Sequence, residues 1–354
     1  MHEHKKNIKG RAAGYNSPNK FSSKNYAFDH IEGIDEPFYS NENTQYLTET
    51  PATIVHKVNS PDVGLAYSLN AYQGCEHGCI YCYARNSHEY WGYSAGLDFE
   101  RKIIVKKNAP ELLEAFLNKP KWTATPITIS GNTDCYQPAE RKFELTRKIL
   151  EVFLKYKHPV AIITKNSLIL RDLDLLAELN KLDLVHVNVS ITTLEEKVRQ
   201  KLEPRTSTAT NRLKTVEALS NVGIPVNVMT APIVPGLTDH EIPALIKAAS
   251  EAGAVSASYI ITRLNGTLDQ LFKEWIHREF PEKADKVLNQ IAACHNGKLN
   301  DSRFGIRMSG EGKVAEAIRD LFRLSCKKYL NNKTLKPLNL SLFTPRNGSQ
   351  LSMF

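Results

Sequence analysis

Three of the chain's six cysteines, Cys75, Cys79 and Cys82, fall in the nine-residue stretch GCEHGCIYC at 74–82. Thiolates crowded onto one short loop are typical of ligands for zinc or for an iron–sulfur cluster. Three thiolates on a four-iron cluster leave one iron without a protein ligand. Such an open position is a property of catalytic metal sites rather than structural ones. The spacing therefore predicts a metal centre and favours a chemical role for it.

The residues around the thiols leave two alternatives open. A structural zinc site takes four ligands, and no second cysteine pair follows, so zinc would need His77 or His88 as its fourth ligand. A catalytic cluster needs no such histidine. Gly74 and Gly78 suit a loop that curls around a cluster, because glycine adopts unusual φ values without a Cβ penalty.

Composition limits the class of protein. The chain has 354 residues, of which 42% are hydrophobic and 24% charged, and this balance predicts a soluble globular protein. No apolar run reaches the length of a membrane helix, and the N-terminus lacks the apolar region of a secretory signal. We therefore expect a cytoplasmic protein without a disulfide framework, in which Cys294 and Cys326 are ordinary buried residues. The net charge of +8 permits a nucleic-acid partner without demanding one.

An alternation of apolar and helical segments predicts the fold. The apolar runs are 67–72, 126–130, 160–164, 184–191, 225–231 and 256–262, and the helical segments between them are 109–118, 140–156, 170–181, 210–223 and 239–253. Strands that alternate with helices in this way form right-handed parallel βαβ units. Six units are too few for a complete eight-stranded barrel. We therefore predict an α/β fold, an incomplete (β/α)6 TIM-type barrel with a mainly helical C-terminal region.

The same pattern suggests four parts. Residues 1–50 lack a sustained apolar period and are predicted to be a flexible arm that docks in places through Tyr26, Phe28 or Tyr46. Residues 51–262 form the barrel. Three helical stretches make 263–330 a helical cap, and 331–354 is predicted to be an irregular tail.

Chemistry in such barrels lies at the carboxyl ends of the strands, and polar residues follow each apolar run. Lys165 ends the third strand, where its charge would be costly without a partner. His186, Asn188 and Ser190 alternate on the fourth strand, which predicts either a polar barrel interior or a set of satisfied core hydrogen bonds. Arg205 follows that strand and could bind a carboxylate or phosphate with both guanidinium arms.

The cysteine spacing, with an aromatic residue before the third cysteine and a barrel strand before the loop, resembles the radical SAM superfamily. The resemblance implies a [4Fe–4S] cluster on Cys75, Cys79 and Cys82, with S-adenosylmethionine (SAM) bound to the open iron. It implies reductive cleavage of SAM to methionine and a 5′-deoxyadenosyl radical, which abstracts hydrogen from a substrate. It also implies that Tyr81 packs beside the adenine and that a reductant such as flavodoxin or ferredoxin supplies the electron.

The stretches NAYQGCEHGCIYCYAR, TDCYQPAE and RFGIRMSGEG extend the resemblance, over nearly the whole chain, to the spore photoproduct lyase-like group, in a bacterial subgroup mostly without assigned substrate. That resemblance implies that Thr133 and Asp134 meet the amino end of SAM. It further implies that Lys165 and Ser190 contact its carboxylate or ribose, and it makes Arg205 a weaker candidate. The residues alone allow a second interpretation of the 130–140 loop, an Asx turn made by Asn132 or Asp134.

One departure from that group concerns the source of the returned hydrogen. Spore photoproduct lyase has a hydrogen-donating cysteine a few residues before the aspartate of this loop, whereas here the stretch is SGNT. Cys135 follows Asp134 instead and is a weak candidate for a catalytic residue, with packing as the favoured interpretation. The difference puts thymine-dimer repair in doubt and leaves the radical chemistry untouched.

Two functions follow. The first is a radical SAM enzyme that acts on an unidentified substrate, for which a nucleic acid is one candidate. The second is a non-enzymatic nucleic-acid-binding protein with a structural metal site, favoured by the basic residues of the first 25 positions and by the net charge. The missing second cysteine pair counts against the second function.

Overall fold

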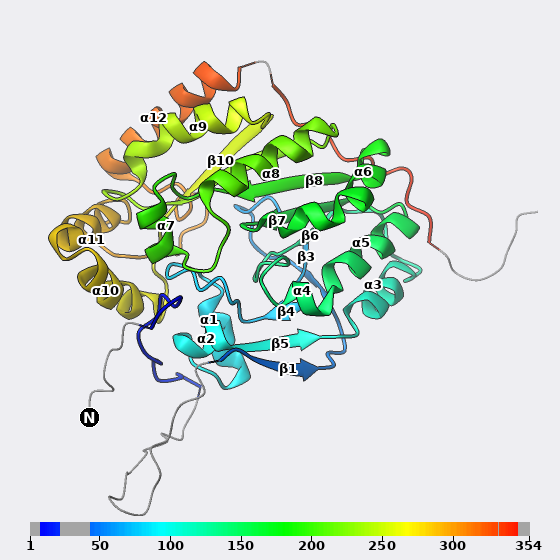
Figure 1. The fold of residues 1–354 in the computed structure, drawn as a ribbon, viewed down its shortest axis with the longest axis horizontal. Coiled ribbons are helices and arrows are strands. Elements are labelled where there is room, and N and C mark those ends of the chain that lie inside the picture. The colour runs from blue at the N-terminus through cyan, green and yellow to red at the C-terminus, as the bar shows by residue number, and fades with distance from the viewer. Residues whose placement is uncertain (1–7, 22–42, 332, 346–354) are drawn as a thin grey trace, which may run out of the picture.

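The computed structural model describes residues 8–21, 43–331 and 333–345, and its centre is a seven-stranded sheet (Figure 1). The strands lie in the order β10-β9-β8-β7-β6-β3-β2, and all neighbours are parallel except β2 and β3. Their bounds are β2 Val55–Lys57, β3 Tyr67–Leu69, β6 Ile127–Ile129, β7 Val160–Thr164, β8 Val185–Ser190, β9 Val226–Ile233 and β10 Ser256–Ile261. The six predicted strands and their parallel order are confirmed, as an incomplete barrel.

The strands form where β-branched residues can be buried. In β7 and β8, Val160 pairs with Val185 and Ile162 with Val187, and all four side chains are buried. Helices pack around this sheet (Figure 1). Their bounds are α3 Ala109–Leu117, α4 Glu140–Phe143, α5 Leu145–Lys155, α6 Leu173–Lys181, α7 Glu196–Leu202, α8 Ala209–Asn221 and α9 Ile242–Glu251. Short 3-10 turns, η2 Ser167–Asp172 and η3 Asp239–Glu241, precede α6 and α9.

The helix predicted over 140–156 is broken into α4 and α5. Glu144 between them has a left-handed backbone with φ of 51°. The buried Glu140 carboxylate accepts hydrogen bonds from the Thr146 N–H at 3.0 and 3.1 Å, so it caps the start of α5. Arg171 donates to the same carboxylate at 2.7 Å. This capping arrangement has no counterpart in the apolar period of the sequence, and a single helix was the wrong prediction.

A second, three-stranded sheet corrects the prediction of a flexible arm. Strand β1, Gln45–Glu49, pairs in parallel with β5, Lys102–Lys106, and β4, Tyr72–Gln73, pairs with the other edge of β5. Residues 45–49 are therefore part of the fold. Tyr46 docks as predicted, with its ring 5.2 Å from that of Phe143, whereas Tyr26 and Phe28 lie outside the described residues.

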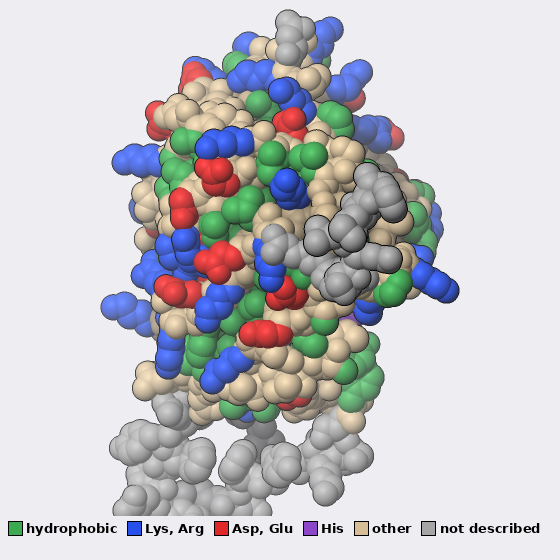
Figure 2. Space-filling model, turned by 90° about the vertical axis from the view of Figure 1, so that its right-hand side faces the viewer, with side chains coloured by type: hydrophobic (Ala, Val, Ile, Leu, Met, Phe, Trp, Pro, Cys, Tyr) green, Lys and Arg blue, Asp and Glu red, His purple; other side chains and the backbone are tan. Residues whose placement is uncertain are grey.

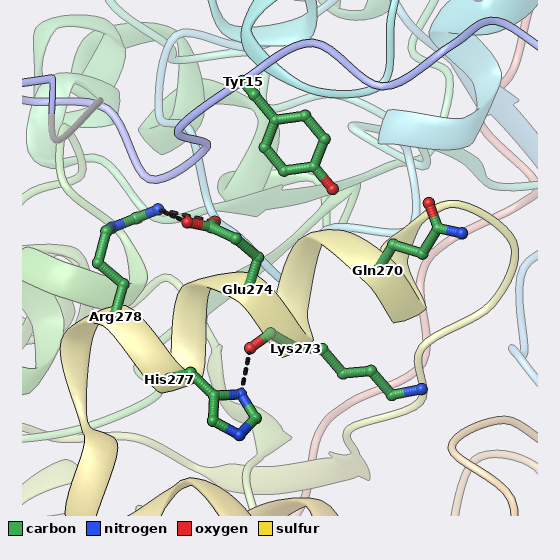
Figure 3. A pocket seen from close by; sticks show the side chains of 6 residues that line it. All are labelled: Tyr15, Gln270, Lys273, Glu274, His277 and Arg278. Atoms are coloured by element: carbon green, nitrogen blue, oxygen red, sulfur yellow. Dashed lines mark hydrogen bonds and ion pairs between the residues drawn. The ribbon is translucent and has the colours of Figure 1, made fainter. Parts of the chain in front are cut away.

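Residues 8–21 are also packed on the molecule. Ala12 and Ala13 are buried, and Arg278 donates a hydrogen bond to the Ala12 carbonyl at 2.8 Å. Figure 3 shows Arg278 paired with Glu274 on helix α10, Leu268–Glu279, beside Tyr15, where these side chains line a shallow pocket. This described part of the predicted arm is therefore held against the fold, because its backbone accepts a hydrogen bond from a residue far along the chain.

The C-terminal region is helical as predicted. Besides α10 it contains η4, Pro281–Lys283, α11, Ala284–Ala293, and α12, Gly312–Tyr329, and α12 packs against α9. Residues 333–345 form no helix or strand, but the Asn339 N–H donates to the Asp183 carbonyl at 2.8 Å. The domain boundaries themselves stay a prediction.

The distribution of charge on the surface does not identify a binding site. The face shown in Figure 2 mixes basic, acidic and hydrophobic side chains without a large area of one charge sign. Among the described residues, no helix combines the length and the apolar character that crossing a membrane would require.

Candidate active site

The cysteine loop begins directly after β4 and runs into helix α1, Arg85–His88. Cys75 and Cys79 are buried and Cys82 is partly exposed. The loop is fixed at both sides, because the Cys75 N–H donates to the Phe99 carbonyl at 2.8 Å and the Ile80 N–H to the Leu202 carbonyl at 3.0 Å. The sequence therefore folds into a rigid turn that gathers three thiols.

Burial raises the pKa of all three thiols above the usual range. For Cys75, the charges of Asp134, Cys79 and Cys82 raise the pKa further, since these groups lie close together. Thiols in this environment stay protonated unless a cation stabilises the thiolates, and a bound metal ion or cluster supplies such a charge.

Glycine is required at two positions of the loop. Gly74 and Gly78 have φ of 77° and 67°. A Cβ on Gly74 would lie 2.7 Å from the Lys102 carbonyl oxygen, and one on Gly78 would lie 2.8 Å from the Glu100 carboxylate. The prediction from their positions in the sequence is confirmed, with steric crowding as an additional reason.

A buried arginine holds the back of the loop. Arg85 donates to the carbonyls of Gly78 and Cys79 at 2.8 and 2.9 Å and pairs with the buried Glu100 at 2.6 Å. Glu100 lies in α2, Leu97–Arg101. No pattern in the sequence indicates this pair, since neither residue belongs to an apolar period or a ligand spacing.

Asp134 joins the second and third barrel strands to the cysteine loop. Its carboxylate accepts hydrogen bonds from the Thr164 hydroxyl and the Lys165 N–H, both at 2.8 Å, and lies 3.4 Å from His77 Nδ1. It also accepts from the Tyr136 N–H at 2.9 Å, which is the predicted Asx turn. Burial would raise the pKa of Asp134, but His77 and these hydrogen bonds outweigh it and lower the pKa to about 2.

Three predicted cofactor-binding residues come together at the strand ends. Lys165 Nζ donates to the Ser190 hydroxyl at 2.9 Å and lies 5.9 Å from the centre of the Tyr81 ring. Within the described chain, no carboxylate oxygen lies within 4.0 Å of Nζ, so a hydroxyl is its hydrogen-bond partner. An ammonium group at a barrel mouth without an acidic partner suits a ligand carboxylate.

Tyr81 is anchored by residues that the sequence did not reveal. Its hydroxyl donates to the buried Glu203 carboxylate and lies 3.2 Å from the Thr192 hydroxyl. Glu203 also pairs with the buried Arg212, which donates to the Ser190 carbonyl at 2.8 Å. Glu203 lies two residues before Arg205, and its role could not be predicted because the sequence does not show which charged residues become buried.

Thr133 is buried near Asp134, and its hydroxyl donates to the Tyr72 carbonyl at 2.7 Å. Arg205 is not brought to the Lys165 group. Its guanidinium lies 3.4 Å from Glu76 and 3.5 Å from the Thr44 hydroxyl, outside the strand ends. Arg205 thus has protein partners in this structure, and its contact with the cofactor stays a prediction.

Cys135 packs in the main hydrophobic core, and burial raises the pKa of its thiol well above the usual range. The alternating strand residues are satisfied: Asn188 donates to the Ile162 carbonyl at 3.1 Å and His186 contacts the Lys336 carbonyl at 2.7 Å. Ser190 on the same face meets Lys165 at the strand ends, so the face combines satisfied hydrogen bonds with a polar group at the candidate site. Packing is favoured for Cys135.

The two histidines proposed as zinc ligands have other surroundings. His77 has Asp134 at Nδ1 and the Asn166 amide at Nε2, 3.0 Å away. His88 is buried beside Phe99 and Tyr93, and burial lowers its pKa to about 4. His77 thus has protein partners at both ring nitrogens, whereas the ring nitrogens of the buried His88 have no hydrogen-bond partner among the described residues. The loop itself supplies three thiols, a number that fits a cluster with one open iron.

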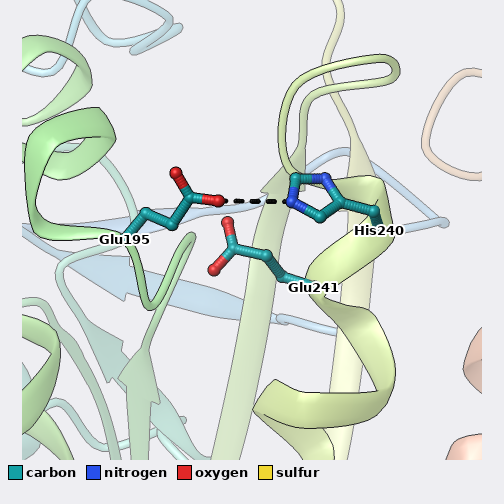
Figure 4. Close-up of side chains that lie close together, drawn as sticks. All are labelled: Glu195, His240 and Glu241. Carbon is teal, nitrogen blue, oxygen red and sulfur yellow. Dashed lines mark hydrogen bonds and ion pairs between the residues drawn. The ribbon is translucent and has the colours of Figure 1, made fainter.

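A second group of ligand-type side chains, Glu195, His240 and Glu241, lies at the ends of β8 and β9 (Figure 4). Glu195 and His240 are exposed and pair with each other at 3.3 Å. The buried Glu241 accepts hydrogen bonds from the Thr193 hydroxyl and the Leu194 N–H. These contacts connect the loops that follow β8 and β9 and give each of the three side chains a protein partner. We therefore assign no metal to this group.

Comparison with known proteins identifies the family. Residues 69–249 match the family model described as the radical SAM superfamily. An uncharacterized protein of Mycobacterium bovis is 33% identical over 226 residues, which cover 63% of this chain and 66% of that protein, just under two thirds. An uncharacterized protein of Methanocaldococcus jannaschii is 30% identical over 229 residues, covering 65% and 82%.

Among solved structures, spore photoproduct lyase complexed with dinucleoside spore photoproduct is similar, with a TM-score of 0.59 and 16% identity over 85% of each chain. At this identity the likeness concerns the fold. The fold and the family model agree with the resemblance drawn from the cysteine loop. The chain belongs to the radical SAM superfamily.

Proposed function

We propose that the protein is a radical SAM enzyme that binds a [4Fe–4S] cluster through Cys75, Cys79 and Cys82 and keeps one iron open for SAM. The observation that carries the proposal is the gathering of exactly these three thiols on one braced loop, while Cys135 packs in the main core. When bound and reduced, the cluster supplies the electron that cleaves SAM to methionine and a 5′-deoxyadenosyl radical.

The protein's own residues would bind and orient SAM. Lys165, with a hydroxyl as its partner, would pair with the carboxylate. Ser190, whose hydroxyl donates to the Ala231 carbonyl at 3.0 Å in this structure, would contact the carboxylate or ribose. Tyr81, held by Glu203, would pack beside the adenine. Thr133 and Asp134 would lie at the amino end, where the ionised Asp134 favours a positive charge.

The substrate is proposed only as a class. A nucleic acid is one candidate, supported by the net charge of +8 and by the fold shared with spore photoproduct lyase. The packing of Cys135 speaks against its use as a hydrogen donor, so dimer repair is not part of the proposal. A reductant such as flavodoxin or ferredoxin is the proposed electron donor.

The test is anaerobic reconstitution with iron and sulfide, followed by reduction with labelled SAM. We expect a brown protein with about four irons per chain and label in 5′-deoxyadenosine. Cys79→Ala should abolish both, whereas Cys294→Ala, a buried thiol outside the loop, should retain both. A colourless protein that takes up zinc alone, with four protein ligands and salt-sensitive binding to DNA or RNA, would instead support a nucleic-acid-binding protein with a structural metal.

A further inference from the structure

Arg263 is a charged residue without a protein partner at the edge of the barrel mouth. It lies two residues after β10 ends, at the same carboxyl edge of the sheet as Lys165. Its side chain is half-buried, and within the described chain it makes no hydrogen bond and no ion pair. A guanidinium that has lost part of its water without gaining an acceptor is unfavourable.

Asp62, the carboxylate whose charge acts on this arginine, is already paired with another residue. Asp62 accepts two hydrogen bonds from Arg307, at 2.8 and 2.7 Å, and one from the Ser60 hydroxyl at 2.9 Å. The charges that act on Arg263 are those of Arg307, Asp62 and Tyr83. Because Arg307 neutralises Asp62, the charge of Arg263 is not balanced by a protein carboxylate and is repelled by the charge of Arg307. A bound anion would reduce this repulsion.

The surroundings suit a ligand that reaches the cysteine loop. Tyr83 follows Cys82 directly, has an exposed fraction of 51%, and donates its hydroxyl to the Gly131 carbonyl after β6. Phe304, 57% exposed, stacks under the Arg307 guanidinium at 4.4 Å.

This region is also the seam of the open barrel. The edge strands are β2 and β10, and they are not paired with each other. The Ile261 N–H on β10 donates to the Met308 carbonyl at 2.9 Å, while Arg307 of the same segment pairs with Asp62 in the loop after β2. The seam is thus bridged by the 303–308 segment, which carries the exposed Phe304, and Arg263 lies two residues after the β10 edge of the seam.

We propose that Arg263 binds an oxyanion, a phosphate or carboxylate group of the substrate, at the seam beside Tyr83. The inference rests on the proposed function, because it places a substrate next to the cluster loop. Arg307 keeps the seam closed through Asp62, and Arg263 offers its guanidinium fork to two oxygens of the anion. The substrate class is therefore an anionic molecule, which includes nucleotides and nucleic acids.

The test is chemical modification of arginine in the full chain at a limiting dose of phenylglyoxal, with each site quantified by peptide mass spectrometry. The probes are inorganic phosphate, acetate and the dinucleotide d(TpT), with thymidine as an uncharged control and sodium chloride to match ionic strength. We expect phosphate, acetate or d(TpT) to slow modification of Arg263 at least threefold. Arg323, an exposed arginine on α12, is the internal control and should be unaffected.

The probes also distinguish the sources of the anion. Protection by d(TpT) at concentrations where phosphate has no effect would indicate a phosphodiester, and protection by phosphate or acetate alone would indicate a small acidic substrate. No protection by any anion, or equal protection by chloride, overturns the inference. The assay needs neither cluster nor SAM, so a protein that cleaves SAM but leaves Arg263 unprotected refutes the inference and not the proposed function.

Discussion

Arg85 and Arg263 are two charged residues with little or partial exposure, and they differ in what they bind. Arg85 is completely buried and donates to four backbone carbonyls and to Glu100. Arg263 is half-buried and has no partner in the described chain. The first arginine is used to hold a loop in shape, and the second is left available to a ligand. A buried charge with every donor satisfied is structural, whereas an unsatisfied one marks a binding position.

The largest expected effect is the difference in unfolding free energy between variants of these two arginines. Arg85→Met leaves the buried Glu100 without its counter-charge and should lower the free energy of unfolding by about 3–5 kcal/mol. Arg263→Met breaks no pair and should change it by about 0.5 kcal/mol or less. Urea denaturation under anaerobic reducing conditions measures both, and equal losses would refute the distinction.

The second expected effect concerns Glu203, a buried carboxylate whose partners, like those of Arg85, belong to the protein itself. Burial would raise the pKa of Glu203, but Arg212, Lys165 and hydrogen bonds from Thr192 and Tyr81 lower it from 4.5 to about 2. A carboxylate with a lowered pKa stabilises the fold fully above pH 4.5 and loses this contribution as the pH falls toward 2.

Glu203→Gln should therefore cost about 3 kcal/mol at pH 7, and the difference from the wild-type protein should shrink between pH 5 and pH 3. Unfolding free energies measured across this range test the prediction. Glu316→Gln, on α12, is the matched control and should show no such trend. A difference that stays constant with pH would mean that the Glu203 charge does not stabilise the fold.

The sequence predicted the features that repeat or cluster locally. Apolar runs located all six barrel strands, and the thiol spacing located the loop that Gly74 and Gly78 shape. The end of the third strand pointed to Lys165, and the family resemblance pointed to Ser190 on the fourth strand, and these two residues do meet. These predictions succeed because hydrophobic periodicity and ligand spacing are properties of neighbouring residues.

The features that it missed depend on partners far apart in the chain. Arg85 and Glu100, or Glu203 and Tyr81, are ordinary polar residues until the fold buries them together. The strand at 45–49 pairs with residues more than fifty positions away, so its polar stretch looked like an arm. The pair of Arg205 and Glu76 is of the same kind, because the two residues are more than a hundred positions apart in the chain.

The smallest expected effect comes from adding a methyl group at Gly78, where the cysteine loop packs against the Arg85–Glu100 pair. Gly64 and Gly78 have similar φ values of 61° and 67°, but a Cβ on Gly64 would meet nothing within 4 Å. Gly64→Ala should cost about 1 kcal/mol, from backbone strain alone. At Gly78 the new Cβ would lie 2.8 Å from Oε2 of Glu100, and movement of this carboxylate would disturb the hydrogen bonds that its other oxygen accepts from Arg85 and the Ala13 N–H.

Gly78→Ala should therefore cost about 1–2 kcal/mol more than Gly64→Ala in the free energy of unfolding. Because Gly78 lies beside Cys79, it should also lower the iron content after reconstitution, which Gly64→Ala should leave at the wild-type level. If both variants lose the same stability and retain the same iron, Glu100 is not a rigid wall of the loop. In that case the Arg85–Glu100 pair would stabilise the fold without shaping the cysteine site.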